Sequence, residues 1–232
     1  DRTMKLQKIA SVCAISCAAL GALSAPAQAQ VSGDVIRIGI ISDMSGLYSD
    51  IDGPAGAEAI SLIPRNDNVA ASRAESRAVT EVALRELLPM LKAHGLKAMV
   101  EPLGFEVCSL RYKDVLAEVI DAVGGRGTYF MVHDTFHHAL AGGGPIYPEL
   151  TGIVHVSGVK DAIYVNDMRD PHRVLVDADD LLGNVAQIRA LRAAGYTGAI
   201  SYEPFAASVH DLTDPKSALA ASMEFIRSGV AA

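Results

Sequence analysis

The order of the apolar segments constrains the fold of this chain more than any other feature. Short apolar runs occupy residues 60–63, 97–101, 128–134, 152–156 and 198–203. Between them lie stretches of helical periodicity at residues 72–94, 112–123, 182–194 and 215–228, with a short one around His138. Strands that alternate with helices predict βα units, a parallel sheet and helical crossovers. We therefore expect an α/β fold.

Sequence signals at the helix ends support this assignment. In the first long helical stretch an apolar residue recurs every four positions from Val79 to Leu91, and Gly95 follows as a stop. The last helical stretch begins with Asp214 as its N-cap and Pro215 at the first helical position. Both helices are thus expected to begin and end close to the limits of their apolar pattern.

Four residues with chemically useful side chains stand at the downstream ends of the apolar runs. They are Glu101, Asp134, His155 and Glu203. Parallel strands of a (β/α) barrel point their C-terminal ends toward one face, and that face holds the active site. Three carboxylates and one imidazole form a hard, oxygen-rich donor set for a divalent cation. The pattern predicts a metal-dependent enzyme.

Length and charge exclude other classes of protein. The chain has 232 residues, 50% of them apolar, so it can bury a sizeable core. Its net charge of -7 and its lack of a Lys/Arg run argue against nucleic acid or an anionic membrane as the partner. Beyond the first 30 residues Cys108 is the only thiol, which rules out an intrachain disulfide framework there. No adjacent base is implied, so we do not expect a nucleophilic cysteine.

Residues 4–29 have the pattern of a secretory signal peptide. Lys5 and Lys8 form a positive start, residues 9–23 form an apolar segment, and Ala27 and Ala29 mark a cleavage site. The apolar segment is shorter than the roughly 20 residues that a membrane span needs, so no stable membrane anchor is expected. The segment predicts export to the periplasm.

The following residues, 30–58, carry a strand pattern at 36–41 and then a Ser/Gly/Asp turn. Together with the leader, this segment resembles the start of periplasmic substrate-binding proteins of the branched-chain amino acid transport type. The resemblance implies a solute-binding protein of an amino acid ABC transporter as one alternative function. It ends at about Glu58, whereas a bilobal binding protein needs several hundred residues more.

A second resemblance covers residues 60–232. The segments VEPLGF (100–105), HDTFHH (133–138), VHVSGV (154–159) and SYEPF (201–205) resemble the xylose-isomerase-like TIM barrels. Within them they are most similar to the sugar isomerase/epimerase branch that includes 2-keto-myo-inositol isomerase. A complete barrel has eight βα units in about 250 residues. The resemblance therefore implies a partial (β/α)8 TIM barrel of about five units, preceded by an unrelated leader and strand.

This combination of segments is interpreted as a chimera. An open barrel leaves sheet edges unpaired, so a non-functional fusion is a further alternative. A homo-oligomer in which the exposed edges pair with each other is another possibility. The enzyme resemblance implies a cytoplasmic protein, whereas the leader predicts a periplasmic one.

The resemblance to the isomerases also implies roles for the four strand-end residues. Glu101, Asp134, His155 and Glu203 would bind one divalent metal ion, such as Mn, Mg, Co or Zn. Glu101 and Glu203 would also be the catalytic acid and base, which move a proton of a sugar or inositol-derived ketose through an enediolate. A dehydratase or epimerase of the same superfamily would use nearly the same ligands.

Four further residues are candidates for substrate binding: His137, Arg173, His172 and Glu106. Similar enzymes place a substrate-contacting or second-metal histidine at the position of His137, and a capping or surface role is the alternative. Arg173 and His172 lie in a charged loop that overlies the site in this family, although charged loops are often only solvated. Glu106 binds substrate or pairs with Arg111.

Two neighbouring histidines are expected to have other roles. His133 should face the opposite side of the pleat from Asp134 and be a structural histidine, and His138 should lie at the surface or behind the site. Asp179 and Asp180 are expected to cap the helix that follows them.

Overall fold

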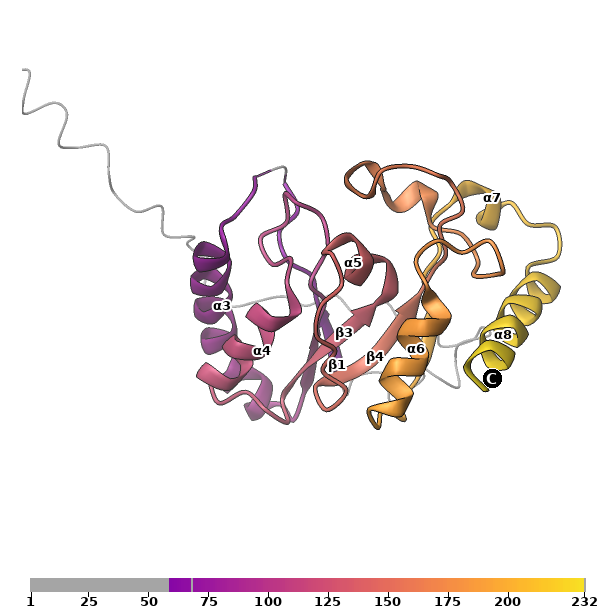
Figure 1. Ribbon diagram of the computed structural model, residues 1–232. Helices are drawn as coiled ribbons and strands as arrows, with labels where there is room; N and C mark the ends of the chain where they lie inside the picture. The colour runs from indigo at the N-terminus through magenta and orange to yellow at the C-terminus, as the bar shows by residue number, and fades with distance from the viewer. Residues whose placement is uncertain (1–58, 68, 232) are drawn as a thin grey trace, which may run out of the picture. The chain divides into compact units, whose positions relative to one another are not determined.

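The computed structural model describes residues 59–67 and 69–231 (Figure 1). The predicted signal peptide, residues 4–29, and the segment that resembles a binding protein, residues 30–58, lie outside the described residues. Within the described part, no helix is both long and apolar enough to cross a membrane.

The described strands form a single parallel sheet in chain order. The strands are β1 (Ala59–Leu62), β2 (Lys97–Val100), β3 (Tyr129–Asp134), β4 (Thr151–Val156) and β5 (Ile200–Tyr202). Every neighbouring pair is parallel, and the order is β1-β2-β3-β4-β5. Sequential parallel strands with a helical crossover after each one are the arrangement of a TIM barrel. The prediction of a partial TIM barrel is confirmed.

Helices connect these strands, as Figure 1 shows. The α-helices are α3 (Arg73–Ala93), α4 (Lys113–Ala122), α5 (Thr135–Leu140), α6 (Asn184–Ala193), α7 (Ala207–His210) and α8 (Pro215–Ala231). Two 3-10 helices, η1 (Val165–Asp167) and η2 (Asp170–His172), lie in the connection between β4 and α6. Each strand and long helix expected from the sequence is present, with ends that shift by three residues or fewer. The sequence reading missed η1, η2 and α7 because such short elements lack a full period of apolar residues.

Specific side chains fix the helix ends. Ser72 and Glu75 form a reciprocal capping box at the start of α3. Asp214 Oδ1 accepts a hydrogen bond of 3.0 Å from the Ser217 backbone N–H, which confirms the predicted N-cap of α8. The N-cap of α6 is Gly183, and the Asp180 carboxylate accepts the backbone N–H of the next residue, Asn184, at 2.9 Å.

Three apolar clusters stabilise the described part. The first packs α3 and α4 against β1, β2 and β3, with Leu116 and Ile120 completely buried. The second packs α6 and α8 against β4 around Ile188 and Leu191. The third lies between α5 and the loops at the C-terminal ends of the strands, around Phe136. The third cluster supports the loops that carry the candidate site residues.

The strand register aligns those residues. Asp134 is the last residue of β3 and pairs with His155 of β4. Glu101 directly follows β2, and its backbone N–H donates to Leu62 O at 3.1 Å. Glu203 directly follows β5 and donates in the same way to Val156 O at 2.9 Å. The hydrogen bonds between the strands thus continue one residue beyond β2 and β5. They hold the Glu101 and Glu203 side chains at the same level of the sheet as those of Asp134 and His155.

Close packing between the β2 loop and α5 depends on Gly104. A Cβ atom at this position would lie 2.3 Å from His137 O and 2.6 Å from Leu140 Cβ. No real Cβ atom tolerates such contacts, so only glycine lets the loop after Glu101 pass this close to α5.

Candidate metal centre

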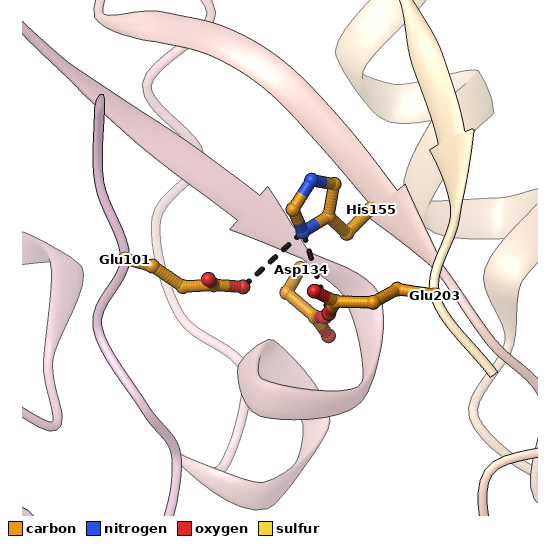
Figure 2. A group of neighbouring side chains, drawn as sticks. All are labelled: Glu101, Asp134, His155 and Glu203. Carbon is orange, nitrogen blue, oxygen red and sulfur yellow. Dashed lines mark hydrogen bonds and ion pairs between the residues drawn. The ribbon is translucent and has the colours of Figure 1, made fainter. Parts of the chain in front are cut away.

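Glu101, Asp134, His155 and Glu203 meet at the C-terminal ends of four adjacent strands (Figure 2). One donor atom from each side chain lies within 4.8 Å of the donor atoms of the others. Glu101 and Asp134 are buried, whereas His155 and Glu203 are partly exposed. The cluster therefore has a closed side and an open side.

His155 stands between the two glutamates. Its Nδ1 lies 3.3 Å from Glu101 Oε1 and 3.4 Å from Glu203 Oε2. Burial by itself would lower the pKa of the His155 imidazole, but the hydrogen bonds and charges of the two glutamates outweigh burial and raise this pKa to about 10. In the metal-free protein the ring is therefore an imidazolium at neutral pH, with its charge directed into the cluster.

Arg173 supplies a second positive charge to the same cluster. Its guanidinium is 1% exposed, and Nη2 donates to Asp134 Oδ2 at 2.5 Å and to Glu203 Oε2 at 2.8 Å. Its Nε donates to Ser157 Oγ at 2.8 Å. Burial opposes the charge of Glu203, yet the contacts with His155 and Arg173 lower the pKa of this carboxyl to about 2. The cluster thus contains ionised Glu203 beside two cations.

Asp134 also determines where α5 begins. Its Oδ1 accepts the His137 backbone N–H at 3.0 Å, which makes Asp134 the N-cap of this helix. The His137 ring is 4% exposed, and its Nδ1 has no hydrogen-bond partner among the described residues. Burial lowers the pKa of His137, which favours the neutral ring. A buried nitrogen without a partner is available for a ligand.

The donor set fits one divalent ion. Ligand atoms bind such an ion at roughly 2.0–2.2 Å, so donors on opposite sides of it lie about 4 Å apart. The mutual spacing of the four donor atoms, within 4.8 Å, is compatible with this value after small side-chain movements. Carboxylates with one imidazole suit Mn, Mg, Co or Zn.

The other predicted substrate-binding residues lie at different distances from the cluster. Arg173 contacts it directly. The Glu106 carboxylate is 59% exposed and lies 3.9 Å from Arg111, which is the ion-pair alternative for this residue. His172 lies in η2, and its Nδ1 accepts the Arg169 backbone N–H at 2.9 Å. A substrate role for Glu106 and His172 stays a prediction.

A polar cavity of about 280 Å³ lies between the loop after β2 and the 3-10 helices, and the four residues of the cluster are not part of its lining. Glu106, Arg111, Arg169 and Asp170 line it together with Phe105. Asp170 also lies 3.3 Å from Arg173, so one ion-pair chain links the cavity to the cluster.

The sequence reading missed a buried amine behind the site. Lys113 Nζ lies 2.6 Å from His133 Nδ1 and 3.1 Å from His138 Nδ1. His133 is completely buried, as a structural histidine should be, and its Nε2 contacts Gln187 Oε1 at 3.0 Å. His138 is also buried rather than at the surface. No local sequence pattern marks Lys113, and only the fold brings it to these histidines.

Cys108, in contrast, has the inert role expected of it. It is 2% exposed within the third apolar cluster, and burial raises the pKa of its thiol.

Comparison with known proteins places this geometry in a family. A family model described as "Xylose isomerase-like TIM barrel" matches residues 54–229. A crystal structure of a xylose isomerase domain containing protein from Salmonella typhimurium superimposes with a TM-score of 0.64 at 29% identity. This alignment covers 80% of the present chain and 66% of that one.

Two other solved structures show the same fold at lower identity. The IolI protein with a bound zinc atom has a TM-score of 0.66 at 20% identity, over 76% of this chain and 64% of that one. D-allulose 3-epimerase from a Methylomonas species has a TM-score of 0.53 at 18% identity, over 78% of this chain and 65% of that one. The chain thus spans just under two thirds of the length of these proteins. No curated protein sequence matches it.

Proposed function

The chain belongs to the xylose isomerase-like TIM barrel family, and we propose that it is a metal-dependent isomerase or epimerase of a sugar or inositol-derived ketose. The observation that carries the proposal is the convergence of three carboxylates and one imidazole from four successive strands, with all donor atoms within 4.8 Å. Two structural neighbours support the proposal: the IolI structure carries a zinc atom, and the D-allulose 3-epimerase is in complex with D-allulose.

The cluster of Glu101, Asp134, His155 and Glu203 would hold the metal ion. When bound, a divalent ion supplies Lewis-acid polarisation of a substrate carbonyl, which acidifies the neighbouring C–H bond. Asp134 and Arg173 fix the closed side of the cluster, because their contact of 2.5 Å is buried. The open side, where His155 and Glu203 are partly exposed, is where substrate would enter.

Glu101 and Glu203 are the proposed proton carriers. They stand on separate strands and flank His155 at 3.3 and 3.4 Å, so a substrate carbon between them would have one carboxylate on each side. One glutamate removes the proton from the carbon, and the other delivers a proton to the product, through an enediolate of the substrate. Glu203 is ionised at neutral pH, because its contacts with His155 and Arg173 lower its pKa to about 2, and the ionised form is the one that a proton acceptor requires.

Arg173 and His137 are proposed to position the substrate. The Arg173 guanidinium already contacts two carboxylates of the cluster, and a substrate oxygen near Glu203 would lie within its reach. The free Nδ1 of His137 offers one more hydrogen bond. The polar cavity of about 280 Å³, which the ion pair of Asp170 links to Arg173, would receive the far end of the ketose beside Glu106.

Two measurements test the proposal. The first is the metal content of the purified full chain, measured by mass spectrometry, for the wild type and for Glu203→Gln. The second is the exchange of carbon-bound hydrogen of D-allulose, D-fructose or 2-keto-myo-inositol in D₂O, followed by NMR. Glu86→Gln is the matched control, because Glu86 is exposed on α3.

We expect bound metal in the wild type and the control, and strongly reduced metal and exchange in Glu203→Gln. Glu101→Gln should lose exchange to a similar extent. Wild-type protein that is soluble and folded but binds no divalent metal would refute the proposal. The four residues would then be inherited from the family without its metal-binding function.

A further inference from the structure

The buried amine of Lys113 contacts His133, the residue that precedes the candidate metal ligand Asp134. Lys113 begins α4 and is 8% exposed. Its Nζ lies 2.6 Å from His133 Nδ1 and 3.1 Å from His138 Nδ1. Within the described ranges no carboxylate forms an ion pair with this amine. A buried lysine that faces two imidazoles in place of an acid is an unusual environment for an ammonium ion.

The hydrogen bonds of Gln187 determine which nitrogen of His133 carries the proton, and therefore which group donates in the contact between Lys113 and His133. Gln187 Nε2 donates to Thr135 O at 3.1 Å and to Leu182 O at 3.0 Å. Its Oε1 is therefore the acceptor that faces His133 Nε2 at 3.0 Å. Since His133 Nε2 carries the proton, Nδ1 carries the lone pair and accepts a hydrogen bond from Lys113.

These contacts favour the neutral amine over the ammonium. An ammonium has three N–H groups, and the described residues offer only two ring nitrogens as partners. Burial lowers the pKa of Lys113 to about 7, and the negative charge of Asp134 offsets only part of this effect. A large fraction of the side chain is then an uncharged nucleophile at neutral pH.

The amine borders a cavity that favours an anion. The cavity has a volume of about 200 Å³, and Lys113, His138, Arg111, Arg73 and Asp114 are among the residues that line it. Arg73 forms an ion pair with Asp114, so these two charges cancel.

Arg111 retains both a charge and a free donor. Its Nη2 donates to Leu140 O at 2.8 Å, whereas its buried Nε has no acceptor among the described residues. The nearest carboxylate, that of Glu106, is 3.9 Å away and 59% exposed. The charge of this guanidinium would attract a small anion in the cavity.

We propose that Lys113 forms an imine with a short oxo acid whose carboxylate is bound by Arg111. The amine nitrogen attacks the carbonyl carbon, a C–N bond forms and the C–O bond breaks. The carbonyl oxygen leaves as water with the two hydrogens of the amine, so the step needs no oxidant or reductant. The site is separate from the four candidate metal ligands, and the imine forms with or without metal.

The experiment is reductive trapping on the full chain. The protein is incubated at pH 7 with glyoxylate and cyanoborohydride, and the modified lysines are located by peptide mass spectrometry. A lysine of ordinary pKa is almost entirely protonated at this pH, so we expect Lys113 to be modified on the order of tenfold faster than exposed lysines. The wild type alone gives this comparison, because Lys92 and Lys97 are exposed.

Variants test the two named roles. Lys113→Met should remove the fast adduct, whereas Lys92→Met should keep it. Arg111→Gln should slow the reaction with glyoxylate but not with glycolaldehyde, which has the same reactive group and no carboxylate. Modification of Lys113 at the rate of the exposed lysines would overturn the proposal, and equal rates for glyoxylate and glycolaldehyde in the wild type would overturn the assignment of an acid. Because trapping does not use the metal, its failure is independent of the failure of the isomerase proposal.

Discussion

Binding of a divalent ion to the cluster should release one proton, and His155 should be its source. In the metal-free protein the His155 imidazole is protonated, because the two flanking glutamates raise its pKa to about 10. A metal ion binds only the neutral ring, so the proton must leave. Glu203 releases none at neutral pH, because its pKa is about 2.

The size of the effect follows from that pKa. At pH 7 the ring lies 10 - 7 = 3 pH units below its pKa, so about one molecule in a thousand has the neutral form. The apparent metal affinity at pH 7 is therefore about a thousandfold, or about 4 kcal/mol, weaker than that of the deprotonated site. Because protons compete with the metal, affinity should rise about tenfold for each unit of pH between about 6 and 9.

Isothermal titration calorimetry with Mn²⁺ measures this directly. Titrations in two buffers of different ionisation enthalpy give the number of protons released, and a series of pH values gives the slope of the affinity. Mn²⁺ is preferred to Zn²⁺, because zinc lowers the pKa of its bound water to about 7, which adds a second proton.

The control is His155→Gln, which replaces the ring by a neutral amide. This variant should bind the ion more weakly, without proton release and with little dependence on pH. A wild-type affinity that does not change with pH, or a variant that keeps the wild-type slope, would refute the assignment of an imidazolium at the centre of the cluster.

Three other substitutions probe packing and charge. Arg173→Met should lower the free energy of unfolding by about 3–5 kcal/mol, because it leaves the buried Asp134 carboxylate without its partner. Arg85→Met on the exposed side of α3 should change this free energy by less than about 0.5 kcal/mol, and urea denaturation monitored by circular dichroism measures both. Leu116→Ala should lower the free energy of unfolding by about 2–5 kcal/mol, because Leu116 is completely buried. An equal loss for Val82→Ala, at an exposed position, would contradict the placement of Leu116 in the core. Gly104→Ala should lower the free energy of unfolding by about 1–3 kcal/mol, since its Cβ would lie 2.3 Å from a backbone oxygen of α5. The same substitution should weaken Mn²⁺ binding, and an unchanged affinity in calorimetry would contradict a link between this packing and the metal site.

Much of the fold could be predicted because its signals are local. The apolar period of α3, the Gly95 stop and the Asp214 cap each act within a few residues, and the structure confirms the elements they predict. The convergence of the strand-end residues could also be predicted, because parallel strands in register bring their ends to one edge. The pairing of Asp134 with His155 is that register.

The remaining features depend on contacts between residues far apart in the sequence. Arg173 lies in a charged loop, and the sequence of that loop does not show whether its side chain is solvated or buried. In the structure its guanidinium is buried and contacts Asp134, 39 residues away. The same holds for Lys113 and Gln187, which meet His133 across separations of 20 and 54 residues. Such contacts are fixed by tertiary packing and have no local period or cap that a sequence reading could detect.

The positive charges of His155 and Arg173 bear on whether the chain needs a metal ion in order to fold. A group of converging carboxylates without counter-charges would repel itself, and such a chain would need its metal in order to fold. Here the guanidinium and the imidazolium offset part of the carboxylate charge from within the chain. We therefore expect the chain to fold before the proposed metal ion binds, and to keep its structure when that ion is removed or exchanged.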